Sequence, residues 1–488
     1  MTVTSSESAV ISSVPKQLFI GGKWIDGGAG GTIDVVDPST GTSLCSIADA
    51  TEADGRAALD AAVAAQKEFA ATSPRFRADI LRRAFELLHE RIDELALIMT
   101  LEMGKPLAES KGEIVYAAEF FRHFSEEAVR ITGNYQTSPK GDARFIVTKQ
   151  PVGPCILITP WNFPMAMGTR KIGPAIAAGC TSVIKPATLT PLSMLALADI
   201  LREAGLPDGV VNVITTSHTG AVMEPLIRSG KARKLSFTGS TEVGVKLLEQ
   251  SAEKVLRTSM ELGGNAPLLV FEDADLDKAI DGVMAAKMRN GGEACTAANR
   301  IYVQRGIMEQ FSARLSERMG ALTVGRGTVE GTDVGPMVDG TQQNKVADLV
   351  DDAVSKGATV LTGGSKPDGD GFFYSPTVLS NVPADARLAN EEIFGPVAPL
   401  IPFDDEDEAI EKANDSEFGL IAYVFTTELN RALRVSEALE AGMIGLNQGV
   451  VSNPSAPFGG VKASGLGREG GPEGIDEFLE TKYIGMSM

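Results

Sequence analysis

Short apolar runs alternate with segments of helical periodicity from Val152 onward, and this alternation limits the possible folds more than any other feature of the chain. The first series predicts strands at 155–159, 182–185, 210–214 and 234–237, with helices near 166–178, 192–204 and 219–229. A second series predicts strands at 266–270, 300–303 and 359–361, with helices at 277–288 and from 308. Strands that are apolar on both faces and separated by helices form parallel sheets covered on both sides. The sequence therefore predicts an α/β protein with two parallel-sheet units.

The first 150 residues have a different pattern. Residues 18–24 and 37–41 resemble short strands and a turn, whereas residues 52–70 and 75–103 have apolar positions at helical spacing. Residues 1–15 are rich in Ser and Thr and lack the basic and apolar regions of a signal peptide. We therefore expect a disordered lead-in, followed by short strands and then by helices that end near Gly104-Lys-Pro106.

The composition is that of a globular protein, since 43% of its residues are hydrophobic and can form large cores. A chain of 488 residues is longer than one domain, so more than one domain is expected. The four cysteines are widely spaced without a C-x-x-C pair, which argues against disulfides or a zinc site and favours the cytoplasm. No apolar run approaches the length of a membrane span, and no metal-binding motif is present. The formal charge of −19 disfavours nucleic acid and anionic membranes as partners. An anionic ligand would therefore need local cations.

Two loops present groups that suit acyl chemistry. Cys295 lies in the glycine-rich segment 288–296, and Glu261 precedes Gly263 and Gly264. A thiolate attacks a carbonyl carbon, and a carboxylate can take a proton from the thiol or from water that attacks the resulting thioester. The alternative is that Cys295 is a small core residue and Glu261 an acid at a helix start. The flanking glycines favour the catalytic interpretation, because a core cysteine does not need unusual backbone around it.

Two further segments have features of a nucleotide site. Gly239 and Ser240 follow a strand and open a helix, where backbone N–H groups can hold a phosphate. Lys185 ends another strand, at the edge of a parallel sheet where ligands bind. Each has an ordinary alternative: a strand-to-helix turn for Gly239 and Ser240, and a solvated side chain for Lys185. Together they indicate a Rossmann-like dinucleotide-binding unit.

Seven motifs between residues 159 and 462 resemble those of the aldehyde dehydrogenase superfamily in their order, and the resemblance extends over residues 18–483. They are Thr159-Pro-Trp-Asn-Phe-Pro164, Lys185-Pro-Ala-Thr188, Phe237-Thr-Gly-Ser-Thr-Glu-Val-Gly244, Glu261-Leu-Gly-Gly264, the Cys295 segment, Glu391-Glu-Ile-Phe-Gly-Pro396 and Pro457-Phe-Gly-Gly-Val-Lys462. The resemblance implies NAD(P)-dependent oxidation of an aldehyde to a carboxylic acid. It also implies two Rossmann-like parallel-sheet domains and a small β oligomerisation arm. The expected units are a cofactor-binding domain (1–126 and 149–260), a catalytic domain (261–470) and the arm (127–148 and 471–488).

The resemblance also assigns catalytic roles. Cys295 matches the nucleophile, Glu261 the general base and Asn162 the donor to the oxyanion. The residue types fit, because a side-chain amide and the Cys295 N–H can stabilise the oxyanion that forms when a thiolate adds to a carbonyl. Considered without the resemblance, Asn162 is a turn-forming residue before Phe163 and Pro164.

Cofactor contacts are expected from the same matches, at Thr159, Pro160, Trp161, Lys185, Pro186, Ala187, Thr188, Gly239, Ser240, Leu262, Glu392 and Phe394. Thr188 departs from the glutamate that NAD-preferring members often have there. A glutamate accepts from the ribose 2′-OH and repels a 2′-phosphate, whereas threonine removes the repulsion and can donate a hydrogen bond. We therefore expect NADP as the preferred cofactor, with NAD as the alternative.

The longer blocks 161–174 and 463–470 are most similar to the succinate-semialdehyde dehydrogenase branch of the superfamily. Its carboxylate-binding positions match Arg170, Arg289 and Ser452, and guanidinium groups suit a carboxylate. The expected reaction is oxidation of succinate semialdehyde to succinate through a thiohemiacetal and a thioester on the cysteine. The alternative for the arginines is pairing with carboxylates of the protein such as Glu293, which stands where Gln is common and adds a charge near Cys295.

Other functions stay open at this stage. The substrate can be glutarate semialdehyde or an uncharged or cationic aldehyde, and a non-catalytic NAD(P)-binding structural protein can keep this fold. A CoA-acylating reaction is disfavoured because Glu261 supplies a hydrolytic base. Residues 127–148 and 471–488 are expected to pair as strands across a subunit boundary, since unpaired edge strands promote aggregation. A homodimer or homotetramer follows.

Overall fold

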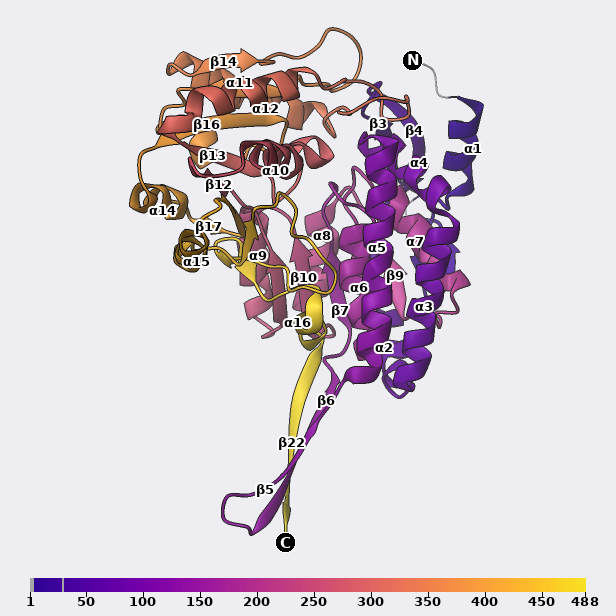
Figure 1. The fold of residues 1–488 in the computed structure, drawn as a ribbon. Coiled ribbons are helices and arrows are strands. Elements are labelled where there is room, and N and C mark those ends of the chain that lie inside the picture. Colours follow the sequence, from indigo (N-terminus) through magenta and orange to yellow (C-terminus); the bar gives the residue numbers. More distant parts are fainter. Residues whose placement is uncertain (1–3, 29) are drawn as a thin grey trace.

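Two large β-sheets organise the computed structural model, which describes residues 4–28 and 30–488 (Figure 1). The first sheet has eight strands. Its five central strands are parallel, and antiparallel strands flank them at both edges. In spatial order the strands are β2 (Lys23–Ile25), β1 (Leu18–Ile20), β9 (Val211–Val213), β8 (Ser182–Lys185), β7 (Cys155–Ile158), β10 (Lys234–Thr238), β11 (Arg257–Glu261) and β21 (Gly465–Leu466).

The second sheet has seven strands, and only its first pair is antiparallel. In spatial order they are β14 (Thr359–Thr362), β15 (Thr377–Ser380), β16 (Val397–Phe403), β13 (Ala298–Gln304), β12 (Ala266–Val270), β18 (Ile421–Phe425) and β19 (Met443–Leu446). Two two-stranded ribbons complete the main body: β3 (Thr32–Asp37) with β4 (Thr42–Ala48), and β17 (Phe418–Gly419) with β20 (Val461–Lys462). The predicted α/β class with two parallel-sheet units is confirmed.

Strand β7 shows why the central strands read as continuous apolar runs. Successive side chains of a strand point to opposite faces of the sheet. Cys155 and Leu157 belong to one buried cluster, whereas Ile156 and Ile158 belong to another on the opposite face. Because helices cover both faces, no position of this strand can be polar without a partner.

Helices cover both sheets. The helices that the periodicity predicts from 52 onward are present, whereas those at 107–127, 340–355, 406–414 and 429–438 were not predicted. The stretch expected at 75–103 is broken at Arg91, where φ is −107° and ψ 19°, and Gly104 ends it in the left-handed region with φ 97°. The helices are α2 (Glu52–Ala70), α3 (Pro74–Glu90), α4 (Ile92–Met103), α5 (Leu107–Glu127), α6 (Ala166–Ala178), α7 (Leu192–Glu203), α8 (Thr219–Arg228), α9 (Thr241–Ala252), α10 (Leu276–Met288), α11 (Met308–Gly320), α12 (Gly340–Ser355), α13 (Arg387–Asn390), α14 (Glu406–Asn414), α15 (Leu429–Ala438) and α16 (Gly471–Asp476).

The disordered lead-in expected at 1–15 is wrong for the residues that are described, since residues 1–3 lie outside them. Helix α1 (Ser5–Ser13) begins with a reciprocal cap between Thr4 and Glu7. Glu7 also forms a buried ion pair with Arg326, and Ile11 lies in the core. The Thr-x-x-Glu spacing is a helix-start signal. The ion pair with Arg326 and the burial of Ile11 thus stabilise a helix in a segment whose polar composition predicts disorder.

The arm is a three-stranded antiparallel sheet that projects from the body (Figure 1). Its strands are β22 (Leu479–Ser487), β6 (Ala143–Pro151) and β5 (Asn134–Thr137). Strand β22 pairs with β6 of the same chain over nine residue pairs, whereas the expected pairing of the arm across a subunit boundary stays a prediction. Helix α16 brings the C-terminal segment to the base of β6, where the Val152 N–H donates to the carbonyl oxygen of Phe478 and Lys149 pairs with Asp476.

Four parallel strands of the first sheet end at one edge. In the register, Ile158 lies opposite Lys185, and Thr238 lies opposite Glu261. The segments that follow these strands therefore leave the sheet side by side. Ligands bind at this edge in open α/β sheets, and the candidate site is built there.

Candidate active site

The Cys295 loop connects helix α10 to strand β13 through backbone of unusual conformation. Asn290, Gly291 and Gly292 have φ values of 56°, 61° and 79°. A Cβ at Gly292 would lie 2.2 Å from the carbonyl oxygen of Gly395, so only glycine allows this close approach. The glycines that flank Cys295 in the sequence thus serve the turn, and the Cys295 side chain remains half-buried.

Asn162 lies in the turn between β7 and α6, and its side chain points to the Cys295 loop. Its Nδ2 donates to the carbonyl oxygen of Glu293 at 3.0 Å, which leaves the second amide hydrogen free. The carbonyl oxygen of Asn162 itself accepts from Lys105 Nζ at 2.8 Å and from Asn290 Nδ2 at 3.0 Å. The turn and the loop are therefore held together by several hydrogen bonds.

Glu261 is the last residue of β11 and is 3% exposed. Neither of its carboxylate oxygens has a hydrogen-bond partner among the described residues. Burial, followed by the charge of Glu469, raises the pKa of Glu261 well above its usual range. Arg170 and Lys171 act in the opposite direction. A Cβ at Gly459 would lie 2.8 Å from Oε1, so the close approach of this segment depends on glycine.

A buried charge cluster is formed by Arg170, Lys171, Glu261 and Glu469. Glu469 lies 2.5 Å from Arg170 Nε and 2.5 Å from Lys171 Nζ. The Arg170 guanidinium stacks 4.2 Å from the centroid of the Phe458 ring and is 1% exposed, and its Nη2 has no hydrogen-bond partner among the described residues. Arg170 is thus paired with a carboxylate of the protein, although Glu469 and not Glu293 is the partner.

Burial raises the pKa of Cys295 to about 11. Arg170 and Arg289 lower this pKa through their positive charges, whereas Glu392 and Glu261 raise it. Glu293 Oε1 accepts from the Val338 N–H at 3.1 Å, and burial raises the pKa of Glu293 well above its usual range. Glu293 forms no ion pair with Arg289 among the described residues, so the expected pairing is wrong, whereas its effect on the pKa of Cys295 stays a prediction.

A cavity of about 210 Å³, here called the Trp161 cavity, opens beside Cys295. Of the residues predicted to form the site, it brings together Pro160, Trp161, Asn162, Gly239, Ser240, Leu262, Cys295, Glu392 and Phe394. The Trp161 and Phe394 rings meet edge to face at 5.3 Å. Its wall also includes Gln342 and Lys345, which sequence reasoning missed.

Two polar groups of this cavity are positioned by the backbone. Ser240 is the N-cap of α9, and a Cβ at Gly239 would lie 2.4 Å from the Phe237 ring, so the turn needs glycine. Glu392 Oε1 accepts from the Gly264 N–H at 3.3 Å. Burial raises the pKa of Glu392 to about 7, so its charge changes near neutral pH.

Five predicted residues lie along the sheet edge but do not line this cavity: Thr159, Lys185, Pro186, Ala187 and Thr188. Lys185 is 6% exposed, and its amine has no partner among the described residues. Burial lowers the pKa of Lys185 to about 8. Thr188 donates its hydroxyl proton to the carbonyl oxygen of Thr216 at 3.1 Å, and its expected donation to a phosphate stays a prediction.

A second cavity, of about 280 Å³ and here called the Arg289 cavity, shares Phe163 with the first. The Arg289 guanidinium lies 5.0 Å from the Phe163 ring centroid and forms no ion pair within the described ranges. Ser452 is half-buried and does not line the cavity. The remaining wall residues are Lys105, Glu109, Gly112, Glu113, Tyr116 and Asn290.

Sequence reasoning missed most of that wall. Lys105 is read as part of a helix stop, yet its Nζ lies 2.5 Å from Glu113 Oε2. The other oxygen of Glu113 accepts from the first N–H groups of α6, and Tyr116 lies on the same helix as Glu113. No motif marks α5 as part of the site; only the 3- and 4-residue spacing of Glu109, Glu113 and Tyr116 places them on one helix face.

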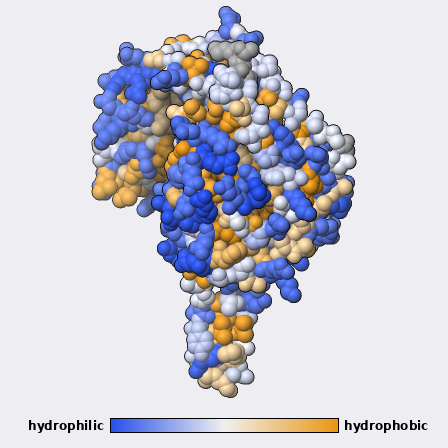
Figure 2. Space-filling view, turned by 90° about the vertical axis from the view of Figure 1, so that its right-hand side faces the viewer, coloured by the Kyte–Doolittle hydropathy of each residue, from blue (hydrophilic) through white to orange (hydrophobic). Residues whose placement is uncertain are grey.

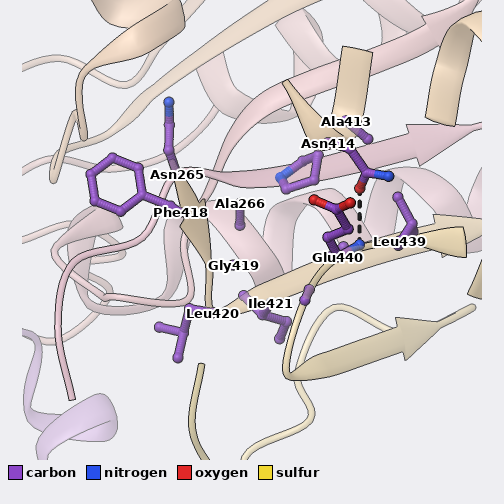
Figure 3. Close-up of a pocket in the computed structure, with 13 residues that line it drawn as sticks. Asn265, Ala266, Ala413, Asn414, Phe418, Gly419, Leu420, Ile421, Leu439 and Glu440 are labelled. Carbon is purple, nitrogen blue, oxygen red and sulfur yellow. Dashed lines mark hydrogen bonds between the residues drawn. The ribbon is translucent and has the colours of Figure 1, made fainter. Parts of the chain in front are cut away.

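A further pocket, whose lining does not include Cys295, lies at the start of β12 and β18 (Figure 3). It holds only about 10 Å³, and Asn414 Oδ1 accepts from the Glu440 N–H at 2.9 Å beside it. It contains none of the predicted site residues. Within residues 4–28 and 30–488, no group of three or more His, Cys, Asp or Glu side chains is suited to a metal, and no helix is long and apolar enough to cross a membrane.

Comparison with known proteins gives consistent results. Residues 24–484 match the model of the aldehyde dehydrogenase family. The chain is 56% identical over 444 residues to a succinate-semialdehyde dehydrogenase of Paenarthrobacter nicotinovorans, covering 91% of this chain and 99% of that protein. It is 50% identical over 473 residues to a glutarate-semialdehyde dehydrogenase of Pseudomonas putida, covering 97% and 98%. A crystal structure of an E. coli NADP-dependent enzyme superposes with a TM-score of 0.96 at 49% identity and covers both chains completely.

Proposed function

Since this chain belongs to the aldehyde dehydrogenase family, we propose that it oxidises succinate semialdehyde to succinate with NADP. The observation that supports this substrate is the Arg289 cavity. There, a guanidinium without an ion-pair partner among the described residues lies beside the nucleophile loop. A carboxylate is the natural partner of such a group in a chain of net charge −19. The names of the compared relatives, one a succinate- and one a glutarate-semialdehyde dehydrogenase, support an ω-carboxylated aldehyde.

In this proposal Cys295 is the nucleophile. Its sulfur forms a bond to the aldehyde carbon, and the carbonyl oxygen takes the negative charge. The free amide hydrogen of Asn162 and the Cys295 N–H stabilise that oxyanion. A bound NADP would supply the hydride acceptor that oxidation of the thiohemiacetal to the thioester on Cys295 requires.

Glu261 completes the cycle as general base. It takes a proton from water as the water oxygen attacks the thioester carbon, and the C–S bond breaks to return the thiolate. Because burial raises the pKa of Glu261, the base form becomes more populated as pH rises. Steady-state turnover is therefore expected to increase with pH above the usual range of a glutamate.

The residues present fit a dinucleotide phosphate. The N-terminus of α9 at Gly239 and Ser240 offers N–H groups to a phosphate, and Lys185 offers a buried amine. Thr188 places no carboxylate where a 2′-phosphate would be repelled. Trp161, Glu392 and Phe394, with Pro160 and Leu262, would enclose the nicotinamide end. Thr159, Pro186 and Ala187 complete the proposed contact set along the sheet edge.

Arg289 is the principal substrate ligand in this proposal. Arg170, through its free Nη2, and Ser452 are retained as further ligands of the carboxylate. We also retain the division into a cofactor-binding unit (1–126 and 149–260), a catalytic unit (261–470) and an arm (127–148 and 471–488). The arm exposes Tyr135, Tyr483, Ile484 and Met486, and hydrophobic residues lie at its surface (Figure 2). Covering them favours a homodimer or homotetramer.

Steady-state kcat/KM over aldehydes of three to six carbons, each with and without a terminal carboxylate and with NADP and NAD, tests the proposal. The four-carbon semialdehyde with NADP should give the highest value, and Cys295→Ala should give no turnover. A higher value for glutarate semialdehyde would move the substrate to the five-carbon acid. Equal values for butanal and succinate semialdehyde would refute a carboxylate site.

A further inference from the structure

We infer that Asn290 is a positioning residue that fastens the oxyanion turn at Asn162 to the nucleophile loop at Cys295. The inference rests on the proposed function, because it assigns a step to each of these two segments. Asn290 acts through other residues, since its side-chain amide binds main-chain carbonyl groups of the turn and the loop and its N–H binds Glu109.

The side-chain amide of Asn290 connects the two segments directly. Its Nδ2 donates to the carbonyl oxygen of Asn162 at 3.0 Å and to that of Glu293 at 2.9 Å. An amide nitrogen carries two hydrogens, so both are used. One acceptor lies 128 positions away in the sequence, and the other is two residues before Cys295.

A third hydrogen bond closes the connection into a triangle. The carbonyl oxygen of Glu293 accepts from Asn162 Nδ2 as well as from Asn290 Nδ2. This bond determines which way the Asn162 amide points, and hence where its second hydrogen lies. Since a displacement of about 1 Å can cost a hundredfold in rate, the triangle fixes the geometry on which oxyanion stabilisation depends.

The backbone of Asn290 is held as firmly as its side chain. Its φ of 56° and ψ of 37° are left-handed, and its N–H donates to both carboxylate oxygens of Glu109, at 3.0 and 3.2 Å. Asn290 is 2% exposed. The simpler explanation is that asparagine is present only because it tolerates this conformation. Glycine tolerates the conformation better but has no amide, so the two explanations can be separated.

The experiment compares Asn290→Gly and Asn290→Asp with a matched control, Asn381→Gly. Asn381 is also left-handed, with φ 54°, but it is exposed and remote from both cavities. The probe is butanal, mixed with excess holoenzyme and NADP so that a single turnover forms NADPH. The count of reactive Cys295 thiols and the unfolding temperature are measured on the same samples.

We expect Asn290→Gly to slow NADPH formation in the single turnover by about ten- to a hundredfold, while one reactive thiol per subunit remains. Asn290→Asp should be slower still, because its carboxylate cannot donate and faces two carbonyl oxygens. Asn381→Gly should match the wild type. A merely structural role would instead reduce the number of reactive thiols and leave the rate of the remaining enzyme unchanged, and that result would overturn the inference, as would a wild-type rate in Asn290→Gly.

The outcome is separable from the proposed substrate. Butanal has no carboxylate, so its single turnover tests Asn290 whether or not succinate semialdehyde is the preferred aldehyde. A wild-type enzyme that oxidises butanal and semialdehydes equally refutes the substrate proposal only. A wild-type rate for Asn290→Gly refutes the positioning role only.

Discussion

Arg170 and Arg289 match the same kind of position in the sequence, yet they occupy opposite environments in the structure. Arg170 is 1% exposed and forms an ion pair with Glu469 in the buried charge cluster. Arg289 is half-buried, lines the Arg289 cavity and has no ion-pair partner among the described residues. Both charges favour the thiolate of Cys295. The two regions thus share an electrostatic effect on the nucleophile and differ in whether the charge is already neutralised.

This difference separates two roles of a cation in this site: a paired guanidinium stabilises the fold, and an unpaired guanidinium binds a ligand. A buried, paired guanidinium is costly to remove, because the carboxylate left behind loses its partner. A guanidinium on a cavity wall is hydrated until a ligand arrives, so its removal affects the ligand more than the fold. Variants of the two arginines and their neighbours should therefore separate a loss of stability from a loss of substrate binding.

The largest effect is expected for Arg170→Leu. Removal of one partner of a buried ion pair costs about 3–5 kcal/mol of unfolding free energy, and Glu469 would retain only Lys171. Chemical denaturation measures this loss. The value of kcat/KM should fall for both butanal and succinate semialdehyde, and somewhat more for the latter because Arg170 Nη2 is proposed as a further carboxylate ligand. The double variant Arg170→Leu/Glu469→Leu should recover part of the stability. A stable Arg170→Leu that fails only on acid-bearing aldehydes would make Arg170 mainly a substrate ligand.

Glu261→Gln tests whether Glu261, unlike Arg170 in the same charge cluster, acts in catalysis. Loss of a general base costs about 10²- to 10⁴-fold in rate, and the loss should fall on deacylation. Stopped-flow mixing should show a first-turnover burst of NADPH followed by slow turnover. Because burial raises the pKa of Glu261, wild-type turnover should rise with pH over a range in which the variant is flat. The absence of a burst would show that Glu261 acts in a step before the thioester forms.

Arg289→Leu should affect the substrate and leave the fold unchanged. One charge-assisted contact is worth about 1.5–3 kcal/mol, so kcat/KM for succinate semialdehyde should fall roughly ten- to a hundredfold, with butanal nearly unchanged. Steady-state kinetics on both aldehydes and one denaturation curve check this. Equal losses on both aldehydes would show that Arg289 supports the loop through Phe163 instead of binding a carboxylate.

Thr188→Glu examines a site away from both arginines. A carboxylate beside a 2′-phosphate repels it, so KM for NADP should rise by about tenfold, or roughly 1.4 kcal/mol, while KM for NAD changes little. Thr188→Ser serves as the matched control, because it keeps a hydroxyl that can donate to Thr216. An unchanged ratio of the two cofactors would show that Lys185 and the α9 N-terminus determine the preference.

The smallest effect concerns the charge that both arginines place on Cys295. Removal of Arg289 disfavours the thiolate and raises the pKa of Cys295 further above its ordinary value. At pH 8, below that pKa, fewer molecules carry thiolate, so alkylation by iodoacetamide should slow about two- to threefold. Glu392→Gln should have the opposite sign and accelerate it. Alkylation that does not respond to either variant would exclude a role for these charges.

Much of the fold could be predicted because it depends on local pattern. Strand positions at 155–158, 182–185 and 234–238 and the helices between them follow from the alternation of apolar runs with helical spacing. Helix α1 could have been found from its Thr-x-x-Glu spacing, but its core contacts involve Arg326, more than 300 residues away. The arm was predicted as strands, yet its pairing partner depends on where α16 returns the chain.

The sequence by itself determined the α/β class, the family motifs and the segments that carry Cys295, Glu261 and Asn162, because each depends on short-range spacing. Only the tertiary structure decided that Glu469 neutralises Arg170, that Glu293 binds the Val338 N–H, and that Lys105 with Glu113 and Tyr116 of α5 lines the Arg289 cavity. Burial and partner choice are properties of packing between distant segments. A charged residue therefore has no fixed role until the fold determines whether a carboxylate, a ligand or water faces it.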